Sequence, residues 1–349
     1  MKLFNILFTL FGVVTVIFFL FQILPGDPAR MMMDQNEDVE QLEIIKKKYG
    51  FDEPILKQYL YYLNDLSIIS IHSKNPEKIN FIRENKYSFT KIYDFQNSTL
   101  VLKFPYLRES YQRRGVKVST IIMDTFPNTV VLAISSILFA TVFGLLLGIF
   151  SALYKETLFD NSIQLFSTFG MSMPSFLSSI IFAWIFGFVL ADITGLNMTG
   201  SLFELDDFGD EYRLELKNLI LPSIVLGIRP IAVISMMMRN SLIETLKKNY
   251  VITAYAKGLS KSKVILNHCL KNSLNPVITA LSGWFASLLA GSVFVEYIFG
   301  WNGLGREIVN SLNLLDVPVI IGAVIVVSFS FIMINIFVDY IYKFLDPRI

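Results

Sequence analysis

The chain has 349 residues, of which 53% are hydrophobic and 17% are charged. It is too apolar for an ordinary soluble domain and too long for a single membrane anchor, so we expect a polytopic membrane protein. A net charge of +1 gives no indication of nucleic-acid binding, the single cysteine, Cys269, excludes an internal disulfide framework, and two histidines, His72 and His268, exclude a histidine-rich metal site.

Six apolar runs are long enough to cross the hydrocarbon core of a membrane, which takes about 20 residues of helix. Lipid offers no hydrogen-bond partners to an open backbone, so each run should be helical. The predicted fold class is an all-α polytopic membrane protein with six transmembrane helices and a large external loop between helices 1 and 2. The runs lie at 4–24, 129–154, 163–190, 219–238, 277–295 and 319–344.

The chain should therefore have three parts. Residues 1–25 form the first transmembrane helix, 26–128 the external loop, and 129–349 a five-helix core. The first helix should be retained, because its apolar run is longer than the roughly 7–15 apolar residues of a signal peptide and no small-x-small cleavage site follows it.

The external loop contains an unusual stretch at about 65–108. It mixes aromatic and β-branched residues with many charges, which favours a small strand-containing insertion over disorder. The alternative is a decoration without a role in transport.

The second and third runs carry small and polar residues. Gly144 and Gly148 form a GxxxG pair that permits a close helix crossing, although tolerated glycines are an alternative. Ser172, Pro174 and Ser175 mark a polar, kinkable segment that could line a water-filled path. Small hydroxyls also cost little in ordinary helix packing, and that alternative stays open.

Arg229 lies near the middle of the fourth run, where a cation costs several kcal/mol unless it faces water or a partner. It is therefore a candidate for the translocation pathway. The alternative is that the span lies deeper than drawn and that the side chain of Arg229 extends to the interface.

Loop charges predict the orientation. Residues 239–275 hold seven Lys or Arg and one acidic residue, whereas 191–217 hold two basic and seven acidic residues. Because cytoplasmic loops carry the excess of positive charge, 239–275 should lie inside and both termini should be cytoplasmic.

The cytoplasmic loop at 239–276 has features of a docking segment. Ala254 and Gly258 stand four residues apart, so they would share a helix face with little side chain on it. Gly258 followed by Ser260 predicts that one short helix ends and another begins, and Pro276 suits the first turn of the next span. The alternative is an ordinary connector whose basic residues only satisfy topology.

Glycines at 300, 303 and 305 do not form a nucleotide-binding loop, because no strand precedes them and no P-loop lysine follows. No G-x-x-x-x-G-K-[ST] motif occurs anywhere, so this chain cannot hydrolyse ATP by itself.

The loop resembles the cytoplasmic EAA loop of permease subunits from bacterial ABC importers for dipeptides, oligopeptides and nickel, of the first of the two permease types. The matching residues are Tyr250, Thr253, Ala254, Ala256, Lys257, Gly258, Leu259, His268, Asn272, Pro276 and Thr279. Further similar segments are LPGDPA at 24–29, YGFDEPILKQYLYYL at 49–63, SYQRRGVKVSTII at 110–122, an SxPSF-like pattern at 172–176, GSVFVEYIFGWNGLGREI at 291–308 and DPRI at 346–349. The resemblance covers the chain except for the insertion at about 65–108.

The resemblance implies that the loop docks an ATPase. Arg239 matches one of two arginines near the inner end of the family's fourth helix and joins the pathway candidates, whereas Ser235 stands where the other arginine is usual. Tyr255 also departs from the family, which commonly has arginine there. The implied docking residues are Thr253, Ala254, Tyr255, Ala256, Lys257, Gly258 and Leu259.

The resemblance also implies the function of the assembly. Two cytoplasmic ATPase subunits would drive alternating access in a pair made of this chain and a second homologous permease, with cargo delivered by an external substrate-binding protein. The implied location is the bacterial inner membrane. No catalytic or metal-binding residue and no cofactor is expected in this chain, since the partner subunits use the ATP.

Peptides are the expected cargo, with nickel or another small solute as the alternative. A secondary transporter would need ion-coupling groups and repeated halves, but the loop motif occurs once and few carboxylates other than Asp339 lie in apolar runs. A membrane enzyme or receptor would need a catalytic cluster or a signalling domain, and the sequence contains neither.

Overall fold

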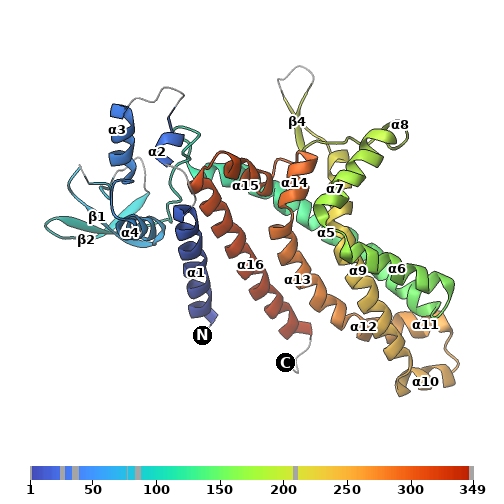
Figure 1. The fold of residues 1–349 in the computed structure, drawn as a ribbon. Helices are drawn as coiled ribbons and strands as arrows, with labels where there is room; N and C mark the ends of the chain where they lie inside the picture. The colour runs from blue at the N-terminus through green and yellow to red at the C-terminus, as the bar shows by residue number, and fades with distance from the viewer. Residues whose placement is uncertain are drawn as a thin grey trace. The chain divides into compact units, whose positions relative to one another are not determined.

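The computed structural model describes residues 2–23, 28–33, 39–76, 78–82, 88–206 and 211–345, most of them helical (Figure 1). The chain divides into two compact units. Unit 1 contains Met1–Asp124 and Asn310–Ser328, and unit 2 contains Thr125–Val309 and Phe329–Ile349.

Unit 1 is built around aromatic packing between its first and fourth helices. The ring of Phe18 in α1 lies 5.3 Å from that of Tyr59 and 5.7 Å from that of Tyr62, both in α4. Tyr62 is almost fully buried, and Ile321 completes this small core. The helices of unit 1 before α5 are α1 (Lys2–Ile23), α2 (Pro28–Met31), α3 (Val39–Tyr49) and α4 (Ile55–Leu66).

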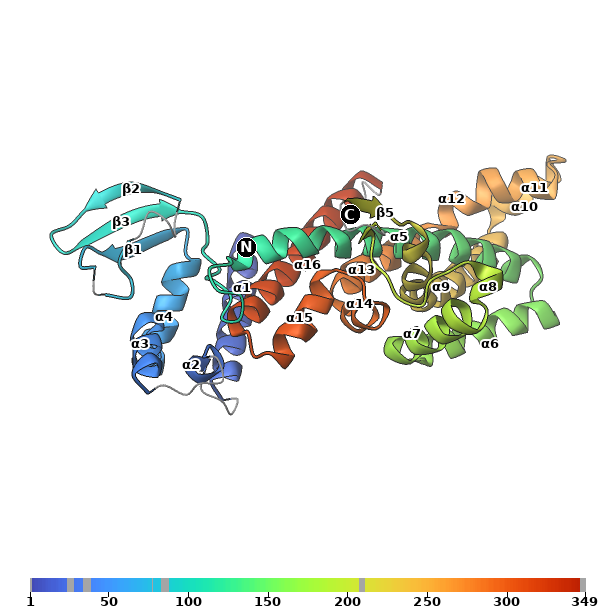
Figure 2. The same ribbon diagram turned by 90° about the horizontal axis from the view of Figure 1, so that it is seen from above.

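A three-stranded antiparallel sheet in unit 1 lies within the stretch 65–108. Its strands are β1 (Ile69–Ser73), β2 (Phe89–Asp94) and β3 (Ser98–Lys103), and β3 is central, as Figure 2 shows. Side chains alternate between the two faces of a strand, and in β3 Thr99, Val101 and Lys103 are the buried set. Aromatic and β-branched residues favour this pleated, half-buried arrangement.

Unit 2 is a helical bundle that also carries a two-stranded hairpin, which the sequence did not lead us to expect. The hairpin pairs β4 (Phe203–Leu205) with β5 (Tyr212–Leu214).

The α- and π-helices that follow β3 along the chain are α5 (Val118–Leu153), α6 (Leu158–Ser172), α7 (Ser175–Trp184), η1 (Ile185–Val189), α8 (Ala191–Thr194), α9 (Lys217–Leu246), α10 (Asn249–Ala256), α11 (Lys261–Val264), η2 (Ile265–Cys269), α12 (Leu270–Ser273), α13 (Asn275–Gly291), α14 (Val293–Phe299), α15 (Leu304–Asn313) and α16 (Val317–Leu345).

Three described helices are long and apolar enough to cross a membrane unbroken: α5, α9 and the part of α16 at Val317–Val338. Two bent helix pairs also qualify if each counts as one span, Leu158–Ser172 with Ser175–Val189 and Lys261–Ser273 with Asn275–Gly291. In α1, the described apolar stretch is shorter.

The run predicted at 163–190 is not one straight helix, because the chain bends by 109° between α6 and α7, at the segment around Pro174 that was expected to kink. Pro174 has no N–H to donate and disfavours helical geometry at the residue before it, so Met173 is extended, with φ −72° and ψ 128°. The run expected at 277–295 is also interrupted, since α13 ends at Gly291 and α14 begins at Val293.

The GxxxG pair permits close packing of α5 on α9, as predicted. A Cβ atom at Gly144 would lie 2.8 Å from Cβ of Ile234, and one at Gly148 would lie 2.6 Å from the carbonyl oxygen of Ser235. Any larger residue would push the two helices apart.

The glycines near the end of the chain pack around a buried carboxylate. The side chain of Glu296 accepts hydrogen bonds from the Ser292 hydroxyl at 2.8 Å and from the backbone N–H of Gly305 at 2.6 Å. A Cβ atom at Gly303 would collide with that carboxylate, and one at Gly305 would lie 2.6 Å from Cα of Val293. These glycines therefore serve close packing around the carboxylate of Glu296.

Candidate docking segment and translocation cavity

Helix α10 forms because its apolar residues recur on one face. Val251 and Ala254 are buried, and both belong to an apolar cluster with Met238 and Leu242 of α9. On the other side of α10, Ile252 is 58% and Tyr255 40% exposed. One face thus anchors the helix to the bundle, while the other is free to meet a partner.

Gly258 ends this helix in a Schellman motif, so the prediction of a C-terminal cap there is confirmed. Its φ of +78° is left-handed, a conformation that glycine adopts without strain. The N–H of Gly258 donates to the carbonyl oxygen of Tyr255 at 2.9 Å, and the N–H of Leu259 donates to that of Ala254 at 3.4 Å. Leu259 packs against the same apolar cluster as Ala254, and α11 begins two residues later at Lys261.

The bare helix face expected from Ala254 and Gly258 does not form. Ala254 is only 5% exposed and contacts the protein's own core, while Gly258 lies beyond the end of the helix in open space. A spacing of four residues places two side chains on one face but does not say which way that face points. Ala254 can therefore affect docking only by holding α10 in place.

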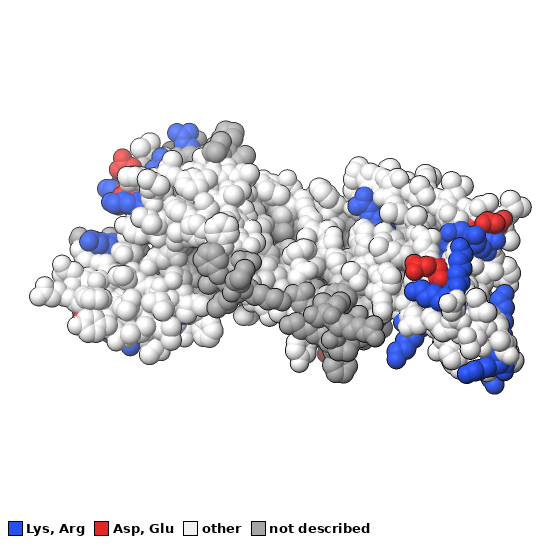
Figure 3. All heavy atoms as spheres, turned by 90° about the horizontal axis from the view of Figure 1, so that it is seen from below, with Lys and Arg blue, Asp and Glu red and all other residues white. Residues whose placement is uncertain are grey.

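The exposed surface of this segment is basic and carries isolated apolar side chains. Figure 3 shows Lys and Arg side chains gathered over the part of unit 2 that carries α10, α11 and α12, beside a few acidic ones. Leu266, 63% exposed, joins Ile252 as an apolar contact candidate that the sequence comparison had not singled out. The exposed residues among the predicted docking set are Thr253, Tyr255, Ala256, Lys257 and Gly258.

A hydrogen bond holds the two sides of the loop together. The side-chain amide of Asn272 in α12 donates to the hydroxyl of Tyr250 in α10 at 2.8 Å. Together with the buried contacts of Val251, this bond fixes α10 relative to α12.

A buried ion pair lies near this loop, between α6 and α9, and it was not predicted. The guanidinium of Arg239 donates to both carboxylate oxygens of Asp160, at 2.7 and 2.6 Å. The side chain of Asp160 is fully buried and that of Arg239 is 15% exposed. The carboxylate also accepts hydrogen bonds from the Ser151 hydroxyl and from the backbone N–H of Glu156. Four segments of unit 2 therefore meet at one carboxylate.

The ion pair gives Arg239 a structural role beside the predicted one. This arginine had been grouped with the pathway candidates, but its guanidinium is engaged by Asp160 and it does not line the cavity that contains Arg229. The structure places it in a contact that holds α6 against α9.

The cavity beside Arg229 joins two of the predicted pathway residues. Ser175, at the start of α7, and Arg229, in α9, both line a hollow of about 60 Å³, together with Trp284 of α13. Ser172 and Pro174 are exposed and do not line it. The remaining lining residues are Gly170, Met173, Ser178, Val225, Leu226, Ile228, Ser287, Leu288 and Gly291.

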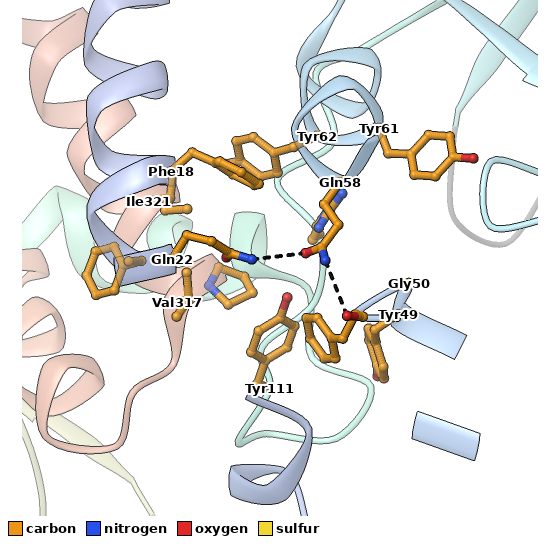
Figure 4. Close-up of a pocket in the computed structure, with 14 residues that line it drawn as sticks. Phe18, Gln22, Tyr49, Gly50, Gln58, Tyr61, Tyr62, Tyr111, Val317 and Ile321 are labelled. Atoms are coloured by element: carbon orange, nitrogen blue, oxygen red, sulfur yellow. Dashed lines mark hydrogen bonds between the residues drawn. The ribbon is translucent and has the colours of Figure 1, made fainter. Parts of the chain in front are cut away.

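A second small cavity, of about 50 Å³, lies in unit 1 (Figure 4). Gln22 of α1 and Gln58 of α4 meet across it at 3.5 Å, and Gln58 also donates to the carbonyl oxygen of Phe51 at 3.3 Å. Tyr62 borders the cavity, and burial raises the pKa of its phenol. The polar contacts and aromatic walls explain how α1, α4 and the 49–51 turn are held together.

Comparison with known proteins identifies the family of this chain. The family model described as "Binding-protein-dependent transport system inner membrane component" matches residues 144–349, and the corresponding N-terminal model, "Binding-prot-dependent transport system membrane comp, N-term", matches residues 1–81. The chain belongs to this family. The N-terminal model ends at residue 81, before β2, and the other model begins at residue 144, within α5. Most of the three-stranded sheet therefore lies outside both models.

Relatives cover the whole length of the chain. The di/tripeptide transport system permease protein of Pseudomonas aeruginosa is 32% identical, covering 98% of this chain and 95% of the relative. The dipeptide transport system permease protein of Alkalihalophilus pseudofirmus is 30% identical, covering 97% and 95%. The glutathione transport system permease protein of Escherichia coli K12 is also 30% identical, covering 100% and 97%.

A solved structure shares the fold. A chain of the MetNI methionine ABC transporter in an inward-facing conformation matches with a TM-score of 0.53 at 14% identity, covering 65% of this chain and 97% of that chain. The matched part of this chain therefore shares its fold with that transporter chain.

Proposed function

We propose that this chain forms half of the translocation pathway of an ATP-driven importer for short peptides. The observation that carries the cargo class is the full-length similarity to permeases named for dipeptides, tripeptides and glutathione. All three cargos are short peptides with a free carboxylate, so one set of pathway side chains can bind each of them through the same group.

The partners follow from the absence of an ATP-binding motif in the sequence and from the exposed loop. A cytoplasmic ATPase would bind the outer face of α10 and the exposed basic side chains beside it, among them Lys257. Two such ATPases, a second homologous permease and an external substrate-binding protein complete the importer. In this arrangement the ATPase is contacted directly by the exposed docking residues, Thr253, Tyr255, Ala256, Lys257 and Gly258, while Ala254 and Leu259 hold the segment against the bundle.

The proposed topology has six spans in the bacterial inner membrane with both termini in the cytoplasm. The α6–α7 pair counts as one bent span, α13 crosses without α11 and α12, which stay in the cytoplasmic loop, and α1 supplies the first span. Residues 26–128 then lie outside as a loop that carries the three-stranded sheet, and the core at 129–349 presents 239–276 to the cytoplasm.

The test is transport by the complete importer in proteoliposomes. We expect ATP- and binding-protein-dependent accumulation of a labelled dipeptide, with glutathione as a second cargo. Accumulation of nickel but of no peptide would assign the alternative cargo. Accumulation of dipeptide that follows an ion gradient without ATP would show a secondary transporter and contradict the proposal.

A further inference from the structure

Arg229 sits deep in an apolar helix with no internal partner. It is residue 13 of the 30 in α9, so at about 1.5 Å per residue it lies about 18 Å from one end of the helix and about 26 Å from the other. Its side chain is exposed, and among the described residues no hydrogen bond or ion pair engages it. A lone cation at this depth costs several kcal/mol unless water or an anion meets it.

The break between α6 and α7 brings a second source of positive potential to the same cavity. The first N–H groups of a helix have no intrahelical partners, and Pro174 supplies no capping side chain to α7. Ser175, the first residue of this ten-residue helix, lines the cavity with Arg229. Broken membrane helices commonly direct such half-helix N-termini at the anionic groups of a transported molecule.

The remaining wall suits a carboxylate. None of the described residues that line the cavity is acidic, so none of them would neutralise the arginine. The hydroxyls of Ser175 and Ser287 border it and have no hydrogen-bond partner within the described part of the chain. Donors, positive charge and a flat Trp284 side chain thus surround one hollow.

We infer that this cavity binds the C-terminal carboxylate of a peptide as the peptide crosses the membrane. The inference rests on the proposed function, since it takes a peptide as the cargo. Arg229 supplies the charge-assisted hydrogen bonds, and the N-terminus of α7 with the hydroxyls of Ser175 and Ser287 supplies the further donors. A phospholipid headgroup is a poor alternative, because headgroups lie at the membrane surface whereas Arg229 stands near the middle of the apolar run at 219–238.

Cysteine protection in the assembled importer tests the inference without the binding protein. Ser287 is exposed and borders the cavity, so Ser287→Cys in a Cys269→Ala background gives a reporter whose labelling by a water-soluble maleimide can be followed by mass spectrometry. Dialanine should slow the labelling, whereas dialanine amide, which lacks the carboxylate, should not. Equal protection by both compounds would overturn the inference.

Variants separate the role of Arg229 from that of the fold. Arg229→Leu should raise the dialanine concentration needed for half-protection by at least about tenfold, because a charge-assisted hydrogen bond is lost. Arg229→Lys should retain most of the protection, and Arg213→Leu, which removes an exposed arginine of β5, should change nothing. Unaltered protection in Arg229→Leu would contradict the inference.

Assembly and uptake are measured on the same preparations. If Arg229→Leu and Arg229→Gln both lose the second permease on purification, the arginine serves subunit pairing and the inference is wrong. If the wild-type importer accumulates dipeptide but protection does not depend on the carboxylate, only the inference fails. If no peptide is accumulated at all, the proposed function itself fails.

Discussion

The ion pair between Asp160 and Arg239 gives a prediction whose size follows from its burial. Replacing Asp160 by Asn keeps the shape of the side chain but leaves the guanidinium of Arg239 without a counter-charge. Breaking a buried pair by removing one partner costs about 3–5 kcal/mol. Because the Arg239 side chain is 15% exposed, we expect a loss of unfolding free energy at the lower end of this range, about 3 kcal/mol.

Thermal unfolding of the purified importer in detergent measures the effect. For a unit of this size, about 3 kcal/mol corresponds to a fall in Tm of about 6–12 °C. Glu244→Gln is the matched control in α9, since it breaks an exposed i,i+4 pair with Lys248 and should cost no more than about 0.5 kcal/mol.

A double variant tests the electrostatic reasoning further. Asp160→Asn combined with Arg239→Gln removes the unpaired charge and should recover part of the lost stability. A Tm for Asp160→Asn within the range of Glu244→Gln, or no recovery in the double variant, would refute the assignment of this pair as a structural link between α6 and α9.

Two further predictions concern the membrane topology and the stability of unit 1. With Cys269 replaced, a cysteine at exposed Asn97 should react with a membrane-impermeant thiol reagent added to whole cells or spheroplasts, whereas one at exposed Lys261 should not, and the reverse pattern would contradict the topology. Burial lowers the pKa of His72, so below pH 6.5 the unfolded chain binds more protons than the folded one and the stability of unit 1 should fall as the pH decreases. Hydrogen exchange of β1 and β3 above and below pH 6.5 measures this, and His72→Gln should remove the dependence.

Local features were predictable because one or two residues decide them. Gly258 ends α10 since glycine adopts a left-handed conformation without strain, and Gly144 and Gly148 permit close helix packing since they lack side chains. The helices α5 and α9 were predictable from their long apolar runs, because a helix needs about 20 apolar residues to cross the hydrocarbon core of a membrane. A bend near Pro174 was also expected, but its angle of 109° depends on what packs around it.

Long-range pairings could not be predicted in the same way. Asp160 and Arg239 are far apart in the sequence, and each alone resembles an ordinary charge at a helix end. The direction in which Ala254 points depends on the packing of α10 against α9, which a four-residue spacing cannot reveal. The partnership of Ser175 with Arg229 likewise arises only when α7 and α9 pack together.

The central claim, that the loop at 239–276 docks ATPases, is tested most directly by co-purification with Gly258→Glu. A side chain in the left-handed conformation costs roughly 1–2 kcal/mol, and the added bulk and negative charge fall on the exposed basic surface. Gly195→Glu is the matched control, because Gly195 also ends a helix with positive φ and open space around it. We predict that Gly258→Glu loses its ATPase subunits and its cargo-stimulated ATP hydrolysis while Gly195→Glu keeps both. Full retention of the ATPases and of transport by Gly258→Glu would show that the loop is only a connector.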